Sequence, residues 1–165
     1  MVLRKISIRN RGFSLIELLV IMGLISLVAG FGLIVSMDDY RGYNFRSERD
    51  VVVSTLQKAR SQAVSNMCYG SGCTDGKQHG VYFGTPGHYI IFQGASYTAG
   101  DPTNEDIAAK NAAASVSGIT SVVFTQLSGT AVTIPASPST LTVVDTGGHT
   151  SVVTIEASGR IWWSN

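Results

Sequence analysis

The sequence predicts an α+β fold in which one long N-terminal helix packs on an antiparallel β-sheet head. Three features predict it: an apolar run from Phe13 to Ser36, an amphipathic stretch of helical period after it, and short strand-like runs separated by turn residues from Gln78 onward. We therefore divide the chain into a basic leader (1–12), an apolar helix half (13–37), an amphipathic helix half (38–67) and a β-rich head (68–165).

The apolar run is long enough to cross a bilayer. Its 24 residues would extend about 36 Å as a helix, whereas the hydrocarbon core of a bilayer is about 30 Å thick. Four basic residues precede the run without any acidic residue among them: Arg4, Lys5, Arg9 and Arg11. The positive-inside rule then predicts a single-pass protein of the cytoplasmic (inner) membrane, with the leader in the cytoplasm and the head outside.

Glu17 is the one charged residue inside the run. A carboxylate left alone in lipid costs up to about 3 kcal/mol on insertion scales. A charge in this place therefore needs a partner of opposite sign.

The residues around Glu17 form a motif. Gly12 is followed by Phe13-Ser14-Leu15-Ile16-Glu17, which resembles the class III signal of type IV pilins and type II secretion pseudopilins. The resemblance implies that a prepilin peptidase cuts between Gly12 and Phe13, that the new amine of Phe13 is methylated, and that Glu17 faces the terminal ammonium of a neighbouring subunit. The alternative is a signal anchor in which Glu17 lies at headgroup depth.

The amphipathic half predicts a helix with one buried stripe that ends near Asn66. The stripe is expected to contain Phe45, Val52, Val53, Leu56, Ala59, Ala63, Val64 and Met67. Polar residues lie between them and are expected to face water: Arg46, Glu48, Asp50, Lys58, Arg60 and Gln62.

The head is predicted to be all β. Residues 79–83 and 88–93 form a hairpin around the turn Gly84-Thr85-Pro86-Gly87, and 94–117 are a long loop with a short helical turn in 107–114. Further strands are expected at 119–127, 132–134, 141–144, 152–155 and 161–163, with turns that include 135–138. In a strand Trp162 and Trp163 alternate faces, so we expect one of them in the core.

Three strings in the helix and head resemble the minor pseudopilin H and FimT-type minor pilins: Leu56 to Val64, Val123 to Gly129 and Val153 to Ile161. Many major pilins carry a proline in the membrane half of the helix, whereas no proline precedes Pro86 here. The resemblance therefore implies a minor pilin or pseudopilin of a type IV pilus or a type II secretion pseudopilus. Its implied partners are other pilin or pseudopilin subunits, the prepilin peptidase and an inner-membrane assembly platform.

Cys68 and Cys73 are predicted to form a disulfide, because such a pair oxidises outside the cytoplasm. The loop between them is short, so the bridge is a local staple on a turn. A metal site with His79 and His88 is the alternative, although the spacing matches no standard zinc pattern.

We find no catalytic constellation and no cofactor motif, so the sequence predicts that the protein is not an enzyme. His79, His88 and His149 are expected in turns or at strand ends. The acidic segment 101–106 is a candidate calcium site, but the spacing of its acidic residues differs from that of the EF-hand loop.

The alternative function is a pilus-tip receptor that binds DNA for uptake. From Cys68 onward the chain has three Lys and Arg against six Asp and Glu, and a nucleic-acid groove needs clustered cations. This alternative requires that Lys77, Lys110 and Arg160 converge in space.

Overall fold

The computed structural model describes residues 13–71, 73–111, 114–134 and 139–165. For residues 33–38 it describes the backbone alone. The predicted leader with Gly12 and the predicted turn at 135–138 lie outside the described residues. The chain divides into two compact units, 1–40 and 41–165, which we describe separately. Within the described residues there is one helix, α1 (Leu15–Val64), and there are nine strands in two antiparallel sheets.

The helix ends as the sequence predicts, within two residues. Asn66 adopts a left-handed conformation (φ 56°) just after the last helical residue, Val64. The amide of Met67 donates to the carbonyl of Gln62 (3.0 Å), and the amide of Asn66 donates to the carbonyl of Ala63 (3.2 Å). These two bonds form a Schellman motif, which satisfies carbonyl groups that the helix end would otherwise leave unpaired.

The first sheet contains five strands in the order β3-β2-β1-β5-β6. Its strands are β1 (His79–Tyr82), β2 (His88–Gln93), β3 (Glu105–Ala108), β5 (Ser121–Phe124) and β6 (Ala131–Ile134). The predicted hairpin is confirmed: β1 and β2 are antiparallel, with His79 opposite Gln93 and Tyr82 opposite Ile90.

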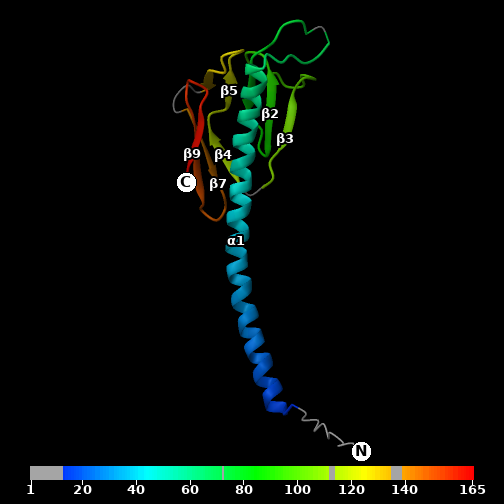
Figure 1. Ribbon diagram of the computed structural model, residues 1–165, viewed down its shortest axis with the longest axis vertical. Helices are drawn as coiled ribbons and strands as arrows, with labels where there is room; N and C mark the ends of the chain where they lie inside the picture. Colours follow the sequence, from blue (N-terminus) through cyan, green and yellow to red (C-terminus); the bar gives the residue numbers. More distant parts are fainter. Residues whose placement is uncertain (1–12, 72, 112–113, 135–138) are drawn as a thin grey trace, which may run out of the picture. The chain divides into compact units, whose positions relative to one another are not determined.

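The second sheet contains four strands in the order β4-β7-β8-β9 (Figure 1). Its strands are β4 (Ser115–Gly118), β7 (Thr140–Val144), β8 (Thr150–Ile155) and β9 (Ile161–Ser164). The sequence predicts an antiparallel β-sheet head, and this head consists of two antiparallel sheets. The short connection Ile119-Thr120 joins β4 to β5 and so carries the chain from one sheet to the other.

One core cluster joins the head part of α1 to both sheets. It includes Leu56 and Ala59 of the helix, Val122 of the first sheet and Leu141 of the second, all with no exposed surface. The predicted stripe is confirmed for six residues: Phe45, Val52, Val53, Leu56, Ala59 and Ala63. Val64 and Met67 were predicted to be buried, but both are exposed, because they lie where the helix ends and leaves the sheets.

Two helix residues that were predicted to face water are buried, namely Glu48 and Gln62. Glu48 is fully buried because the head supplies two donors to its carboxylate. The hydroxyl of Tyr89 donates to Oε1, and the backbone amide of Asn111 donates to Oε2 at 2.8 Å. A buried carboxylate is tolerated when its oxygens accept hydrogen bonds, so burial here follows from a long-range partner rather than from helix periodicity.

The predicted long loop at 94–117 is wrong in part, because it contains two strands. β3 (Glu105–Ala108) pairs with β2, with Tyr89 opposite Ile107, and β4 (Ser115–Gly118) pairs with β7, with Val116 opposite Val143. No helix is assigned among the described residues of the predicted helical turn at 107–114. Each strand has a single half-buried apolar residue, Ile107 or Val116, which is too few to give a period-two signal.

The expectation that one tryptophan lies in the core is also wrong. Trp162 is 41% exposed and Trp163 is 44% exposed. Both belong to β9, which is at the edge of the second sheet, so neither face of this strand is fully covered.

Candidate functional site: the N-terminal segment and the head surfaces

The start of α1 is an N-terminal capping motif. Ser14 precedes the first helical residue, Leu15, and its hydroxyl accepts a hydrogen bond from the amide of Glu17 at 3.3 Å. A Ser followed three residues later by Glu is the capping-box pattern, and the structure has the serine half of it. Our sequence reasoning missed this signal, although Ser14-Leu15-Ile16-Glu17 contains it.

Glu17 lies in the first turn of the helix and is exposed. The free amides of a first helical turn give that end a partial positive charge, so a carboxylate is favoured there. The structure therefore places the one acid of the apolar segment beside the residue, Phe13, at which the predicted cleavage would create a new amine.

The apolar side chains of this segment are uncovered on all sides. Successive helical residues point about 100° apart, and Leu15, Ile16, Leu18, Leu19 and Val20 are each more than half exposed. The window Leu15–Gly32 has a mean hydropathy of 2.3 with no part buried, so by length and composition it can cross a membrane. The hydroxyl of Ser26 is satisfied within the helix, since it donates to the carbonyl of Met22 at 2.9 Å.

Comparison with known families finds one signature in this segment. The prokaryotic N-terminal methylation motif matches residues 8–33. This match supports a type IV pilin-like family. No curated protein matches the chain, and no solved structure does.

The head begins with a turn that is closed by a disulfide. Cys68 and Cys73 are joined by a disulfide with their Cα atoms 5.8 Å apart. Backbone bonds hold the turn and the residues that flank it: the amide of Tyr69, within the loop, donates to Oε1 of Gln93 (2.7 Å), and the amide of Lys77 donates to the carbonyl of Met67 (3.1 Å). The turn is thereby tied to the end of β2 and to the end of the helix.

The three strings that resemble the H and FimT-type proteins meet at one corner of the head. The amide of Leu127 donates to the carbonyl of Ala63 at 3.0 Å, so the second string contacts the helix string. The amide of Ala131, just after the second string, donates to the carbonyl of Ala157 in the third at 3.0 Å. The resemblance therefore covers segments that contact one another, although they are far apart in sequence.

Two glycines make this corner tight. Gly129 and Gly159 both have positive φ (66° and 80°), and a Cβ built on Gly159 would lie 1.9 Å from the carbonyl oxygen of Gly129. A side chain at Gly159 would therefore force the two turns apart. The glycines of these strings are explained by packing, without any ligand.

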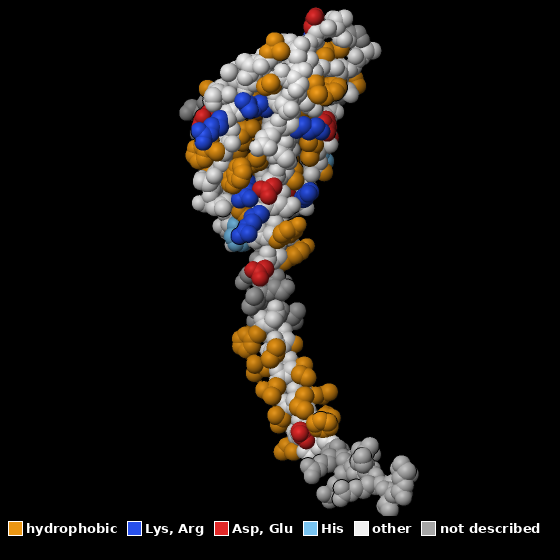
Figure 2. Space-filling view, viewed as in Figure 1, with side chains coloured by type: hydrophobic (Ala, Val, Ile, Leu, Met, Phe, Trp, Pro, Cys, Tyr) orange, Lys and Arg blue, Asp and Glu red, His pale blue; other side chains and the backbone are white. Residues whose placement is uncertain are grey.

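The cations that the DNA alternative requires do not line one site. Arg160 lines a surface hollow of about 540 Å³ together with Arg60, Ser61 and Ser65. Lys110 lines a different groove, of about 530 Å³, with Tyr43, Arg46 and Asp50, and Lys77 lines neither. Figure 2 shows the Lys and Arg side chains spread over the visible face of the head rather than gathered in one patch.

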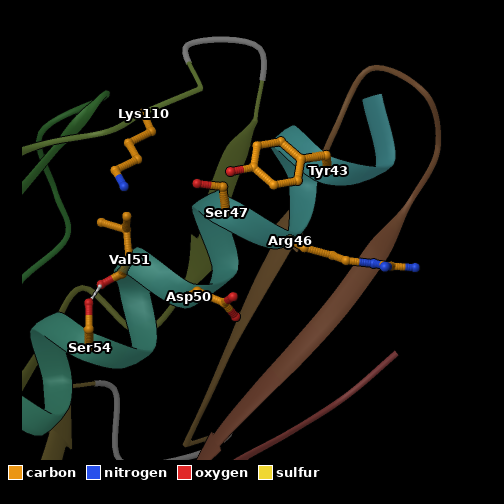
Figure 3. A pocket seen from close by; sticks show the side chains of 7 residues that line it. All are labelled: Tyr43, Arg46, Ser47, Asp50, Val51, Ser54 and Lys110. Atoms are coloured by element: carbon orange, nitrogen blue, oxygen red, sulfur yellow. Dashed lines mark hydrogen bonds between the residues drawn. The ribbon is translucent and has the colours of Figure 1, made fainter. Parts of the chain in front are cut away.

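The groove beside Lys110 does not form an anion site. Figure 3 shows that the side chains of Arg46 and Lys110 point in different directions, so their charges do not converge. Asp50 also lines the groove and forms an ion pair with Arg49 at 2.8 Å. Two cations that point apart, with a carboxylate lining the same groove, give little positive potential at any one point.

Each of the three histidines has a partner at Nδ1, whereas Nε2 of His79 is buried without one. Nδ1 of His79 lies 3.1 Å from the carbonyl of Lys77, so it carries the proton there, and burial lowers the pKa of this histidine against the effect of that bond. Nδ1 of His88 is 2.8 Å from Asp106, and Nδ1 of His149 is 2.9 Å from Asp145. Burial raises the pKa of Asp145, but hydrogen bonds from His149 and Gly147 outweigh it and leave the pKa below its ordinary value.

The described residues contain no group of three His, Cys, Asp or Glu side chains that could hold a metal ion. His79 and His88 have the partners named above. In the acidic segment, Oδ1 of Asp101 accepts hydrogen bonds from the amide (2.8 Å) and hydroxyl (2.7 Å) of Thr103. These bonds close a local turn and lower the pKa of Asp101.

Proposed function

We propose that this chain is a pilin or pseudopilin subunit, of the minor H or FimT type, that is cut between Gly12 and Phe13 and assembles through its N-terminal helix. It would first span the cytoplasmic membrane once, with its head outside the cytoplasm, and then enter a type IV pilus or a type II secretion pseudopilus. The observation that carries the proposal is the exposed apolar helix with Glu17 in its first turn, together with the methylation motif over 8–33.

The assembly step is an exchange of lipid for protein. Exposed side chains such as Leu15 and Leu19 have apolar neighbours both in lipid and against other helices, so the hydrophobic effect does not favour either state. Helix packing and polar contacts therefore decide whether the helices associate. An ammonium on Phe13 of one subunit and the carboxylate of Glu17 on the next would attract strongly in a medium of low dielectric constant. That ion pair would fix the axial alignment of two helices whose apolar surfaces do not themselves specify one.

The substitution Glu17→Ala tests this role in the native host. We expect normal membrane insertion and loss of incorporation into filaments, because the N-terminal ammonium then has no partner. Ser26→Ala is the matched control: it lies in the same apolar segment, but its hydroxyl is satisfied within its own helix. Normal incorporation of the Glu17→Ala chain would contradict the proposal.

DNA binding is the second candidate, because Arg60 and Arg160 line one hollow. A gel-shift titration of the full chain in detergent at low salt tests it. Binding that weakens with salt and is lost with Arg160→Ala would rank this function above filament assembly alone. We expect no such binding, because the other cations of the head are dispersed and interleaved with acids.

A further inference from the structure

The edge strand β9 lacks the features that normally protect a sheet edge. Edge strands expose unpaired backbone amides and carbonyls, and proteins usually blunt them with charged side chains or proline. β9 consists of Ile161, Trp162, Trp163 and Ser164, which include no charge and no proline. Among the described residues, its one partner strand in the second sheet is β8.

Side chains around β9 have the composition of an interaction surface. Trp162 and Trp163 are the only tryptophans of the chain and both are more than 40% exposed. The guanidinium of Arg49 lies 5.3 Å from the ring centre of Trp163 and also contacts Asn165 at 3.2 Å. Tryptophan and arginine are among the residues most enriched at the energetic centres of protein interfaces.

Two arginines and one carboxylate lie at the N-terminal end of β9. Arg60 and Arg160 line the hollow that continues into Ile161, and Glu156 accepts a hydrogen bond from Nε1 of Trp162 at 3.2 Å. Among the described residues, no carboxylate forms an ion pair with either arginine. A strand that lies along β9 would therefore gain from carrying acidic side chains.

The chain itself has such a strand at the opposite edge. β3 is one of the two edge strands of the first sheet, and its first two residues are Glu105 and Asp106. Glu105 contacts Lys58, and Asp106 is 59% exposed with its oxygen near His88. β3 and β9 have four residues each and lie on opposite sides of the head (Figure 1).

We propose that β9 of one copy pairs, edge to edge, with β3 of a second copy. The backbone groups of the two edges complete each other's ladders, the acidic side chains of β3 lie beside Arg60 and Arg160, and the tryptophans are covered. The contact joins two different patches, so it is heterologous, and repetition gives a ring or an open helical array. It is a contact between heads, separate from the helix contact that involves Glu17.

Photo-crosslinking of the full chain in detergent tests the pairing. We place p-benzoylphenylalanine at Ser164, at the end of β9, and mix isotope-labelled with unlabelled chains so that mass spectrometry recognises peptides joined between copies. We expect crosslinks from this position to residues 104–109 of a second copy. The same label at Val132, which is exposed on the edge strand β6, is the control and should give no crosslink to that segment.

Charge exchange separates the contact from misfolding. Asp106→Arg and Arg160→Glu should each reduce the crosslink about tenfold, because each places like charges at the edge pair. A mixture of the two variant chains should restore it, because Glu at 160 on one copy then meets Arg at 106 on the other. Restoration also shows that both variants fold.

Four results would overturn the pairing: no crosslink between copies, crosslinks from β9 to β9, crosslinks to another part of the head, or no recovery in the mixture. Failure here would leave the Glu17→Ala result unaffected, because that test measures the helix contact. Loss of incorporation in Glu17→Ala with an intact β3 crosslink would show that the two contacts act separately.

Discussion

The two halves of α1 have the same backbone conformation and opposite surroundings. In the N-terminal half Leu19 is 65% exposed, and its neighbours on every side of the helix are exposed as well. In the head half Leu56 has no exposed surface and packs in a cluster that draws on both sheets. The head half is covered by the rest of this chain, whereas the apolar side chains described in the N-terminal half are exposed.

The two halves of α1 also differ in the hydrogen-bond partners of their glutamates. Glu48 is buried in the head, where Tyr89 and the amide of Asn111 provide its hydrogen bonds. Glu17 has no side-chain partner that supplies an opposite charge among the described residues, and only its amide is capped by Ser14. The carboxylate of Glu48 is satisfied within the head, and we propose that the carboxylate of Glu17 gains its partner from a neighbouring subunit.

Replacing a leucine by alanine in each half of α1 should give the largest difference in the free energy of unfolding. Leu56→Ala should lower the free energy of unfolding of the head by about 2 to 5 kcal/mol, because it opens a cavity in the core. Leu19→Ala, the matched exposed position, should change it by no more than about 0.5 kcal/mol. Urea unfolding of the full chain in detergent, followed by near-ultraviolet circular dichroism, measures both. Equal losses for the two variants would contradict the division of α1 into a covered and an uncovered half.

The disulfide should stabilise the head by a smaller amount. Replacing Cys68 and Cys73 by Ser should cost about 2 kcal/mol or less and loosen 66–78 without unfolding the sheets, because the closed loop is short. Hydrogen exchange of this segment against that of β5 measures the local effect. Mass spectrometry of protein taken from the envelope under thiol-blocking conditions gives the redox state. Two blocked thiols would contradict the staple, and two thiols that retain zinc would support the metal alternative.

The smallest expected effect is a pH dependence from His79. Burial lowers the pKa of His79 in the folded head below its ordinary value of 6.5. The unfolded chain then binds the proton more readily, so stability is lost as the pH falls below about 6.5 toward the folded pKa and is constant above that value. His79→Asn keeps a donor for the carbonyl of Lys77 and removes the titration. In this variant the free energy of unfolding should no longer depend on pH in this range. An unchanged pH dependence would show that another group causes it.

The helix and the first hairpin could be predicted because their signals are local. Asn66 after an amphipathic run marks a helix end, and Gly84-Thr85-Pro86-Gly87 between two apolar runs marks a hairpin. The strands β3 and β4 could not, because each has one inward apolar residue and owes its conformation to a partner strand far away in sequence. The exposure of both tryptophans has the same cause, since whether β9 is central or at an edge depends on the order of strands in the sheet.

In the N-terminal segment, the capping of the helix by Ser14 could have been predicted, because the sequence has a Ser followed three residues later by Glu. The roles of Phe13 and Glu17, which the motif implies, stay predictions. The burial of Glu48 was not predictable, because its partners Tyr89 and Asn111 lie 41 and 63 residues away. Helical periodicity alone places Glu48 on the face of the helix that is exposed to water.

The mass of the N-terminal peptide tests the central claim most directly. Protein is purified from the envelope of the native host, digested and sequenced by tandem mass spectrometry. The account predicts that the chain begins at Phe13 and that its amine carries one methyl group, which would place a terminal ammonium beside the capped first turn that contains Glu17. A chain that still begins at Met1, or one that is cut after the apolar segment, would contradict assembly through the N-terminal helix.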